Sequence, residues 1–119
     1  MKFILLLLLV EATQSAQILL NSPHDETAGF EFKFKSKLDN VPTAGPIIPN
    51  DWQIDGKEPT IGFAFSGDTI STTNGWEVLL TNVNGKFSDF VIEEITQNNM
   101  HPCRDAHLCI DTDSDGKCD

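Results

Sequence analysis

The chain has 119 residues, with 8 Lys and Arg against 18 Asp and Glu and a formal net charge of −10 at neutral pH. This length suits one domain that buries its own core. The acidity argues against nucleic acid and anionic membrane surfaces as partners, because both attract faces rich in lysine and arginine. It is compatible with cationic partners, metal ions included.

The N-terminus has the pattern of a secretory signal peptide. Lys2 supplies a positive start, residues 3–10 form an unbroken apolar run, and polar and small residues follow. A run of this length is too short to cross a bilayer, which takes about 20 residues in a helix. Thr13 and Ser15 fit the small-residue rule at positions −3 and −1, so we expect cleavage after Ser15, with Ala16 as second choice. The product is expected to be secreted and extracellular, with no membrane insertion.

The residues that follow are typical of short β-strands. Residues 18–20 predict a short first strand. In residues 30–38 (FEFKFKSKL), three phenylalanines alternate with charged residues, which is the period of a strand with one buried face. The proline-rich residues 41–52 (VPTAGPIIPNDW) predict a loop or edge segment, because proline cannot donate to a β-ladder.

Residues 59–71 (PTIGFAFSGDTIS) predict a further strand. Ile61, Phe63 and Phe65 fall on one face of that strand, because they are spaced two apart. The Ser-Gly-Asp at residues 66–68 is a turn or bulge signal.

Two further strands are predicted around Asn84-Gly85. Residues 75–83 (GWEVLLTNV) and 86–96 (KFSDFVIEEIT) flank this dipeptide, which type I′ hairpins prefer. The second of these segments also fits a short amphipathic helix through Phe87, Phe90, Val91, Glu94 and Ile95. The hairpin signal just before it favours a strand.

These patterns predict a mainly β fold, a small antiparallel β-sandwich or barrel with an irregular Cys/Asp-rich C-terminal tail. We divide the chain into a signal peptide (1–15), a β-rich domain (16–98) and the tail (99–119). The tail holds all three cysteines of the chain.

The tail ends in DTDSDGKCD, residues 111–119. Asp111, Asp113 and Asp115 place carboxylates at alternate positions, and Gly116 follows where the backbone must turn sharply. Calcium takes six to eight oxygen ligands at about 2.3–2.6 Å, and a short loop supplies them through such alternation. The residues predict a weak Ca²⁺ site, with a dissociation constant of about 10⁻⁴–10⁻³ M.

This segment resembles the first nine positions of an EF-hand calcium loop, and also the shorter calcium-binding repeats of thrombospondin type 3 domains. The resemblance implies side-chain ligation by Asp111, Asp113 and Asp115. It also implies main-chain ligation by Lys117, and ligation by Asp119 directly or through water. The closing acid of an EF-hand would fall at residue 122, past Asp119. Three possibilities are therefore open: a thrombospondin-type loop, a partial site completed by water, or a site completed by another part of the chain. The alternative is a solvated acidic tail.

The three cysteines predict one disulfide in a secreted protein, with one thiol left over. Three pairings are open; Cys109–Cys118, which would close the acidic loop, is favoured over Cys103–Cys109, which would close a tight turn. A competing arrangement reads His101, Cys103, His107 and Cys109 as four zinc ligands. The oxidising compartment argues against it, because free thiolates do not persist there.

The sequence offers no convincing catalytic group, and we expect no enzyme. Ser66 lacks the glycine spacing of a nucleophile elbow. Glu93 and Glu94 are adjacent, so on a strand they point to opposite faces. Trp52 and Trp76 are expected to pack in the core or against a hairpin rather than to form a sugar-stacking platform.

Two functions are consistent with these features. One is a secreted β-rich binding or structural module with a C-terminal calcium-binding loop, which the ion orders for contact with an extracellular protein or glycan partner. The alternative is a small secreted effector, toxin-like or inhibitor-like, in which the acidic tail is incidental.

Overall fold

The structure is a computed structural model, and it describes residues 15–23, 26–73, 75–97 and 106–119. Residues 1–14 of the predicted signal peptide lie outside these ranges. The regular structure is β1 (Ala16–Asn21), β2 (Thr27–Lys33), β3 (Thr43–Ala44), β4 (Trp52–Asp55), β5 (Thr60–Ala64), β6 (Glu77–Val83), β7 (Val91–Gln97) and β8 (His107–Asp111). The described ranges include no helix, and hence none long and apolar enough for a membrane span.

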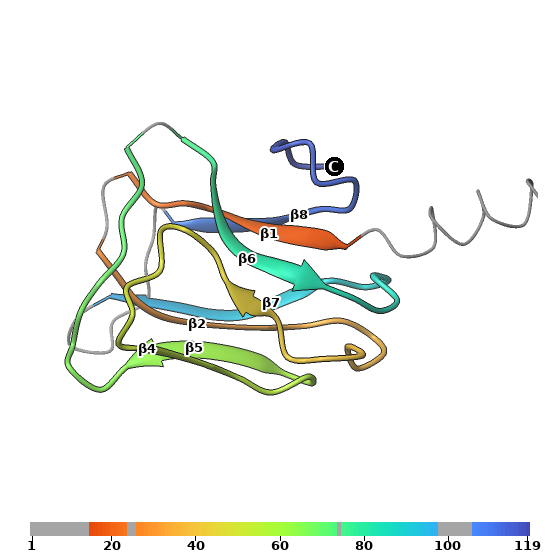
Figure 1. The fold of residues 1–119 in the computed structure, drawn as a ribbon, viewed down its shortest axis with the longest axis horizontal. Helices are drawn as coiled ribbons and strands as arrows, with labels where there is room; N and C mark the ends of the chain where they lie inside the picture. The colour runs from red at the N-terminus through yellow and green to blue at the C-terminus, as the bar shows by residue number, and fades with distance from the viewer. Residues whose placement is uncertain (1–14, 24–25, 74, 98–105) are drawn as a thin grey trace, which may run out of the picture.

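The strands form two four-stranded antiparallel sheets, one above the other in Figure 1. Sheet A has the order β3-β6-β1-β8, and sheet B has the order β4-β5-β2-β7. This confirms the predicted antiparallel β fold. The proline-rich residues 41–52 contribute only the two-residue edge strand β3, as expected for a segment with few backbone donors.

The core lies between the sheets and is rich in aromatic rings. Phe30, Phe32 and Phe34 are all less than 5% exposed, at 4%, 0% and 3%, which confirms their predicted burial on one strand face. The Phe30 ring stacks on that of Trp52 with centroids 6.1 Å apart. Burying each such side chain contributes about 1.5–3 kcal/mol. Trp52 is therefore a core residue as predicted, whereas Trp76 is 38% exposed.

The predicted hairpin around Asn84-Gly85 is wrong. β6 pairs with β1 and β3 in sheet A, whereas β7 pairs with β2 in sheet B, so the segment between them crosses from one sheet to the other. Its backbone bonds to the segment after β2: Asp39 N donates to Asn84 O at 2.8 Å, and Lys35 N donates to Ser88 O at 3.0 Å. Tertiary pairing with β1 and β2 therefore overrides the local turn preference. The strand assignment of residues 91–97 over a helix is confirmed.

β5 carries its large apolar residues on the outer face of sheet B. Ile61 and Phe63 are half-buried there, and Phe65, just past the strand end, is 84% exposed. The inward position between Ile61 and Phe63 is Gly62, where a β-carbon would lie 2.3 Å from the Phe30 ring. Residue 62 on the core-facing side of β5 is therefore a glycine, because the Phe30 ring occupies the space that a side chain would need.

Candidate metal site in the C-terminal loop

The acidic loop follows β8, the edge strand of sheet A beside β1. The β1–β8 register sets Cys109 opposite Leu19 and Asp111 opposite Gln17. A disulfide joins Cys109 to Cys118, with Cα atoms 5.7 Å apart, and Asp119 N donates to Ile110 O at 3.0 Å. The disulfide and this backbone hydrogen bond therefore close the loop at its base.

Of the three pairings left open by the sequence, Cys109–Cys118 is the one formed. Cys103 and His101 lie outside the described residues. Because Cys109 is in a disulfide, it is no thiolate, and the alternative zinc set loses one of its four ligands.

The three alternating aspartates converge. One carboxylate oxygen from each of Asp111, Asp113 and Asp115 lies within 4.8 Å of the other two. Gly116 adopts the left-handed φ of 86° that lets the chain turn back, as the glycine at this position predicted. The sequence therefore identified the residues that the structure brings together.

Asp111 is fully buried, with 0% exposure, while Asp113 and Asp115 are exposed. The carboxylate of Asp111 accepts hydrogen bonds from Gly116 N at 2.8 Å and from Asp115 N at 3.2 Å. Both of these donors are backbone N–H groups of the loop itself, and among the described residues no lysine, arginine or histidine is recorded as a partner of this carboxylate. The buried carboxylate is thus the fixed point around which the two exposed ones gather.

Crowding of these carboxyl groups moves two pKa values in opposite directions. Burial raises the pKa of Asp111, but hydrogen bonds from Gly116, Asp113 and Asp115 outweigh it, so the pKa is lowered. The pKa of Asp113 is raised, first by its hydrogen bond with Asp111, then by desolvation and by the Asp115 charge. Without a cation, Asp113 therefore takes up a proton more readily than Asp111 does.

The other two predicted ligands are placed differently. Lys117 N donates to Asp115 Oδ1 at 2.9 Å, and the Lys117 side chain is exposed. The Asp119 carboxylate accepts from Thr112 N at 3.1 Å and from Thr112 Oγ1 at 2.6 Å. In this structure Asp119 therefore binds the start of the loop and stands apart from the three clustered carboxylates.

The loop also touches the beginning of β1. Ser114 Oγ donates to the carbonyl oxygen of Ser15 at 2.5 Å. This contact joins residues 99 positions apart in the chain.

A second group of polar side chains, unpredicted by the sequence, lies at the open end of the β4–β5 hairpin. Ser66 Oγ donates to the Asp51 carboxylate, and Asp68 N donates to Ser66 Oγ at 3.2 Å. The Ser66 hydrogen bond lowers the pKa of Asp51, whereas hydrogen bonding to Asp51 raises that of Asp68. Pairing of β4 with β5 brings these residues together, so no short sequence motif predicts that they meet.

Comparisons with models of known protein families, with curated proteins and with solved structures found no match to this chain. We therefore infer function from the chemistry of the residues themselves.

Proposed function

We propose that this chain is a secreted β-sandwich module, structural or binding in role, whose C-terminal loop binds a calcium ion. The observation that carries the proposal is the convergence of Asp111, Asp113 and Asp115 to within 4.8 Å. Three anionic groups this close repel one another. The pKa of Asp113 is raised, first by its hydrogen bond with Asp111, then by desolvation and by the Asp115 charge. A divalent cation bound between them would replace repulsion by attraction.

The loop is arranged so that binding requires little new order. Asp111 is already buried and held by two N–H groups, and the disulfide closes the loop. A closure with a sequence separation of 9 removes about 2.7 kcal/mol of chain entropy from the unfolded state in the loop-entropy model. Less conformational entropy is then lost when the ion binds.

The remaining ligands would come from the loop and from water. In the proposed site the Lys117 carbonyl and the Asp119 carboxylate ligate as the resemblance implies, and Asp119 leaves Thr112 or acts through a water. Calcium is favoured over magnesium because it accepts six to eight oxygens in flexible geometry. Magnesium demands a near-ideal octahedron and dehydrates reluctantly.

The proposed role of the ion is to order the tail along the edge of sheet A. An extracellular protein or glycan partner would then meet a rigid loop instead of a flexible acidic one. The Cys109–Cys118 disulfide is compatible with this location, since disulfides persist in oxidising compartments. The role proposed is non-catalytic.

Titration of the secreted chain with Ca²⁺ and with Mg²⁺ tests the proposal, by calorimetry and by the amide resonance of Gly116. We expect saturation by Ca²⁺ with a dissociation constant of about 10⁻⁴–10⁻³ M and much weaker binding of Mg²⁺. Asp113→Ala should abolish the response, and Asp39→Ala, which removes an exposed acid elsewhere, should leave it unchanged. A Gly116 resonance unmoved by millimolar calcium would refute calcium binding and favour the effector alternative.

A further inference from the structure

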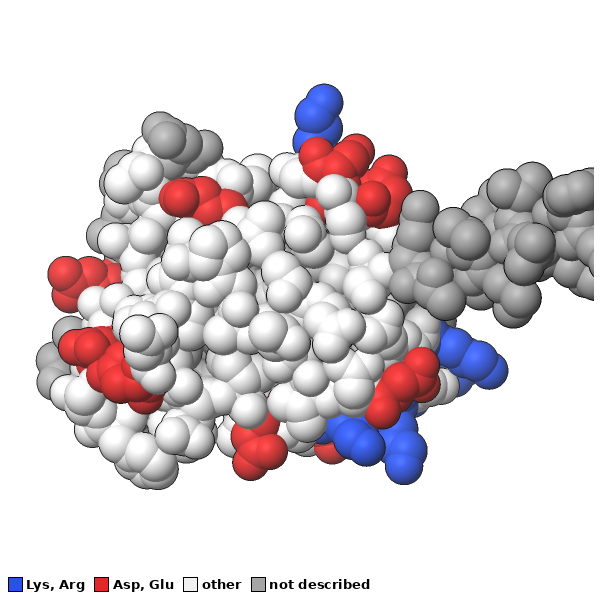
Figure 2. All heavy atoms as spheres, viewed as in Figure 1, with Lys and Arg blue, Asp and Glu red and all other residues white. Residues whose placement is uncertain are grey.

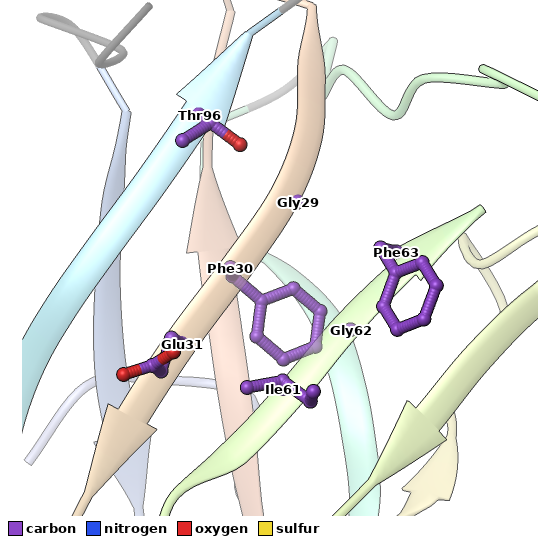
Figure 3. A pocket seen from close by; sticks show the side chains of 7 residues that line it. All are labelled: Gly29, Phe30, Glu31, Ile61, Gly62, Phe63 and Thr96. Atoms are coloured by element: carbon purple, nitrogen blue, oxygen red, sulfur yellow. The ribbon is translucent and has the colours of Figure 1, made fainter. Parts of the chain in front are cut away.

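A shallow groove of about 180 Å³ lies on sheet B and has no part in the calcium proposal. It lies over Gly29 in β2, whose cross-strand neighbours are Phe63 in β5 and Thr96 in β7, as Figure 3 shows. Its lining includes one half-buried carboxylate, that of Glu31, and the exposed Lys33 lies two residues further along the same face of β2. The charges of this face therefore favour neither a cationic nor an anionic partner.

A second feature outside the calcium proposal is Asn84-Gly85, the pair that begins the crossover from β6 to β7. Gly85 adopts a φ of 149°, and a β-carbon on it would lie 3.3 Å from both the Cα and the Cδ2 atom of Leu38, a core residue that is 1% exposed. Glycine is therefore required here by the close approach of a core residue rather than by a hairpin turn.

The side chain of Asn84 belongs to a cluster of three asparagines, Asn40, Asn82 and Asn84. Its Nδ2 atom donates to Asn40 Oδ1 at 2.9 Å and to Asn82 Oδ1 at 3.0 Å. Asn40 Nδ2 in turn donates to Asn82 O at 2.9 Å. Asn84 Oδ1 accepts from Ser15 Oγ at 3.0 Å, a bond that cleavage after Ser15 would remove. The asparagine cluster thus ties the segment after β2 to the end of β6, and it fixes the Asn84 carboxamide.

We infer that Asn84 is a deamidation site that the native fold keeps unreactive. In an asparagine–glycine pair the backbone nitrogen of the glycine reaches the side-chain carbon of the asparagine with little hindrance, because glycine has no side chain. The Gly85 nitrogen loses its proton to solvent and bonds to Cγ of Asn84. The Cγ–Nδ2 bond breaks, and Nδ2 takes up a proton and leaves as ammonia. Water then opens the cyclic succinimide to aspartate or isoaspartate.

The folded structure opposes the first step in two ways. The Asn84 carboxamide must leave its hydrogen bonds to Asn40 and Asn82 before its carbon can meet Gly85 N. The backbone around it must also rotate, yet Asn84 O accepts from Asp39 N at 2.8 Å and Gly85 is held against the core. The reaction therefore requires local opening at the start of the crossover, and such openings occupy only a small part of the time.

The products do not fit the site that the asparagine leaves. Aspartate has no donor, so an acceptor oxygen replaces Nδ2 opposite the acceptors Asn40 Oδ1 and Asn82 Oδ1. Isoaspartate adds a methylene to the main chain and so moves Gly85 from its place against the core. Either product adds a negative charge to a chain of net charge −10, and on the face shown in Figure 2 acidic side chains are spread around the rim while basic ones gather mainly at one end. One opening event is thus made permanent, and the crossover stays loosened.

Deamidation of the folded chain in EDTA is compared with that of the chain unfolded in guanidinium chloride, both in mildly alkaline buffer, by mass-spectrometric peptide mapping. EDTA removes calcium, so the outcome is independent of the metal proposal. Asn74-Gly75, the other asparagine–glycine pair of the chain, is the internal reference, and in the unfolded chain both pairs should react at similar rates. At Asn84 we expect a rate at least about ten-fold lower in the folded chain. Equal rates in the folded and unfolded chains, or no reaction of Asn84 in the unfolded chain, would overturn the inference.

Variants test the asparagine cluster and the product. Asn40→Ala removes an acceptor of the Asn84 carboxamide, so it should raise the folded-chain rate at Asn84 by about three-fold and leave the unfolded-chain rate unchanged. Asn50→Ala, which removes an exposed asparagine outside the cluster, should change neither rate. Asn84→Asp, which reproduces one product, should lower the melting temperature by roughly 4–8 °C. A folded-chain rate that Asn40→Ala leaves unmoved would contradict protection by the cluster, and an unchanged melting temperature of Asn84→Asp would contradict the loosened crossover.

Discussion

Replacing Asp111 by alanine should destabilise the chain even when no metal is present. The side chain is fully buried, and its two oxygens accept hydrogen bonds of 2.8 Å from Gly116 N and 3.2 Å from Asp115 N. Hydrogen bonds to a charged acceptor contribute about 1.5–3 kcal/mol each, less where water replaces the lost partner. Because this loop is partly exposed, we expect a total loss of about 2–3 kcal/mol. For a domain of this size that lowers the melting temperature by roughly 10–20 °C.

The measurement is urea and thermal unfolding in EDTA at neutral pH, with amide exchange of Asp115 and Gly116 as the local readout. Asp115→Ala is the matched control: that carboxylate is exposed and accepts one bond from a following amide, from Lys117 N at 2.9 Å. We expect the control to cost less than about 1 kcal/mol. Equal stability of the two variants would show that Asp111 does not organise the loop.

The pH dependence of the same comparison provides a second check. Hydrogen bonding outweighs burial and lowers the pKa of Asp111, so its contribution to stability is fully present above the unfolded value of about 3.9. It is lost as the pH falls through the folded pKa. The stability difference between the wild-type chain and Asp111→Ala should therefore shrink on acidification. A difference that stayed constant down to strongly acidic pH would contradict the lowered pKa.

Three further predictions concern the loop and the fold. Because the pKa of Asp113 is raised, its contribution to stability is lost as the pH rises through that pKa, so Asp113→Asn should stabilise the metal-free chain at neutral pH. Calcium at ten times its dissociation constant should raise the melting temperature of the wild-type chain by roughly 6–11 °C. The same substitution should abolish that rise. Replacing Cys118 by serine should cost up to about 2.7 kcal/mol relative to the oxidised wild-type chain in urea unfolding, and should leave the two sheets intact by circular dichroism. The reduced wild-type chain is the control, and it should be about as stable as the variant. Gly45→Ala should cost about 2–3 kcal/mol in urea unfolding, because a β-carbon there would lie 2.7 Å from the backbone oxygen of Leu79. If the variant is as stable as the wild-type chain, β6 moves aside at no cost.

Some of the fold could be predicted from local pattern alone. The alternation of Phe30, Phe32 and Phe34 with charged residues settles which face of that strand is buried, because side chains on a strand point alternately to the two sides of the sheet. The alternating aspartates and Gly116 settle the acidic loop in the same way. Their alternate spacing, and the left-handed turn at Gly116, are local features, and the three carboxylates converge around that turn.

Other features escaped the sequence because they depend on which strands meet. Asn84-Gly85 favours a hairpin locally, yet β6 and β7 belong to different sheets, since each pairs with a central strand that arrives from elsewhere in the chain. The Asp51–Ser66–Asp68 group and the groove over Gly29 likewise arise only when β4, β5, β2 and β7 lie side by side. Such contacts are set by tertiary pairing and leave no short motif.

The sequence by itself determined the β class, the buried face of residues 30–34 and the three clustered aspartates, because each follows from side-chain period over a few residues. The tertiary structure decided the order of strands in the two sheets, the burial of Asp111 and the outward face of Ile61 and Phe63. That face turns outward because the Phe30 ring fills the core above Gly62. Packing between strands distant in sequence, rather than the apolar pattern of β5, therefore places the groove on the surface.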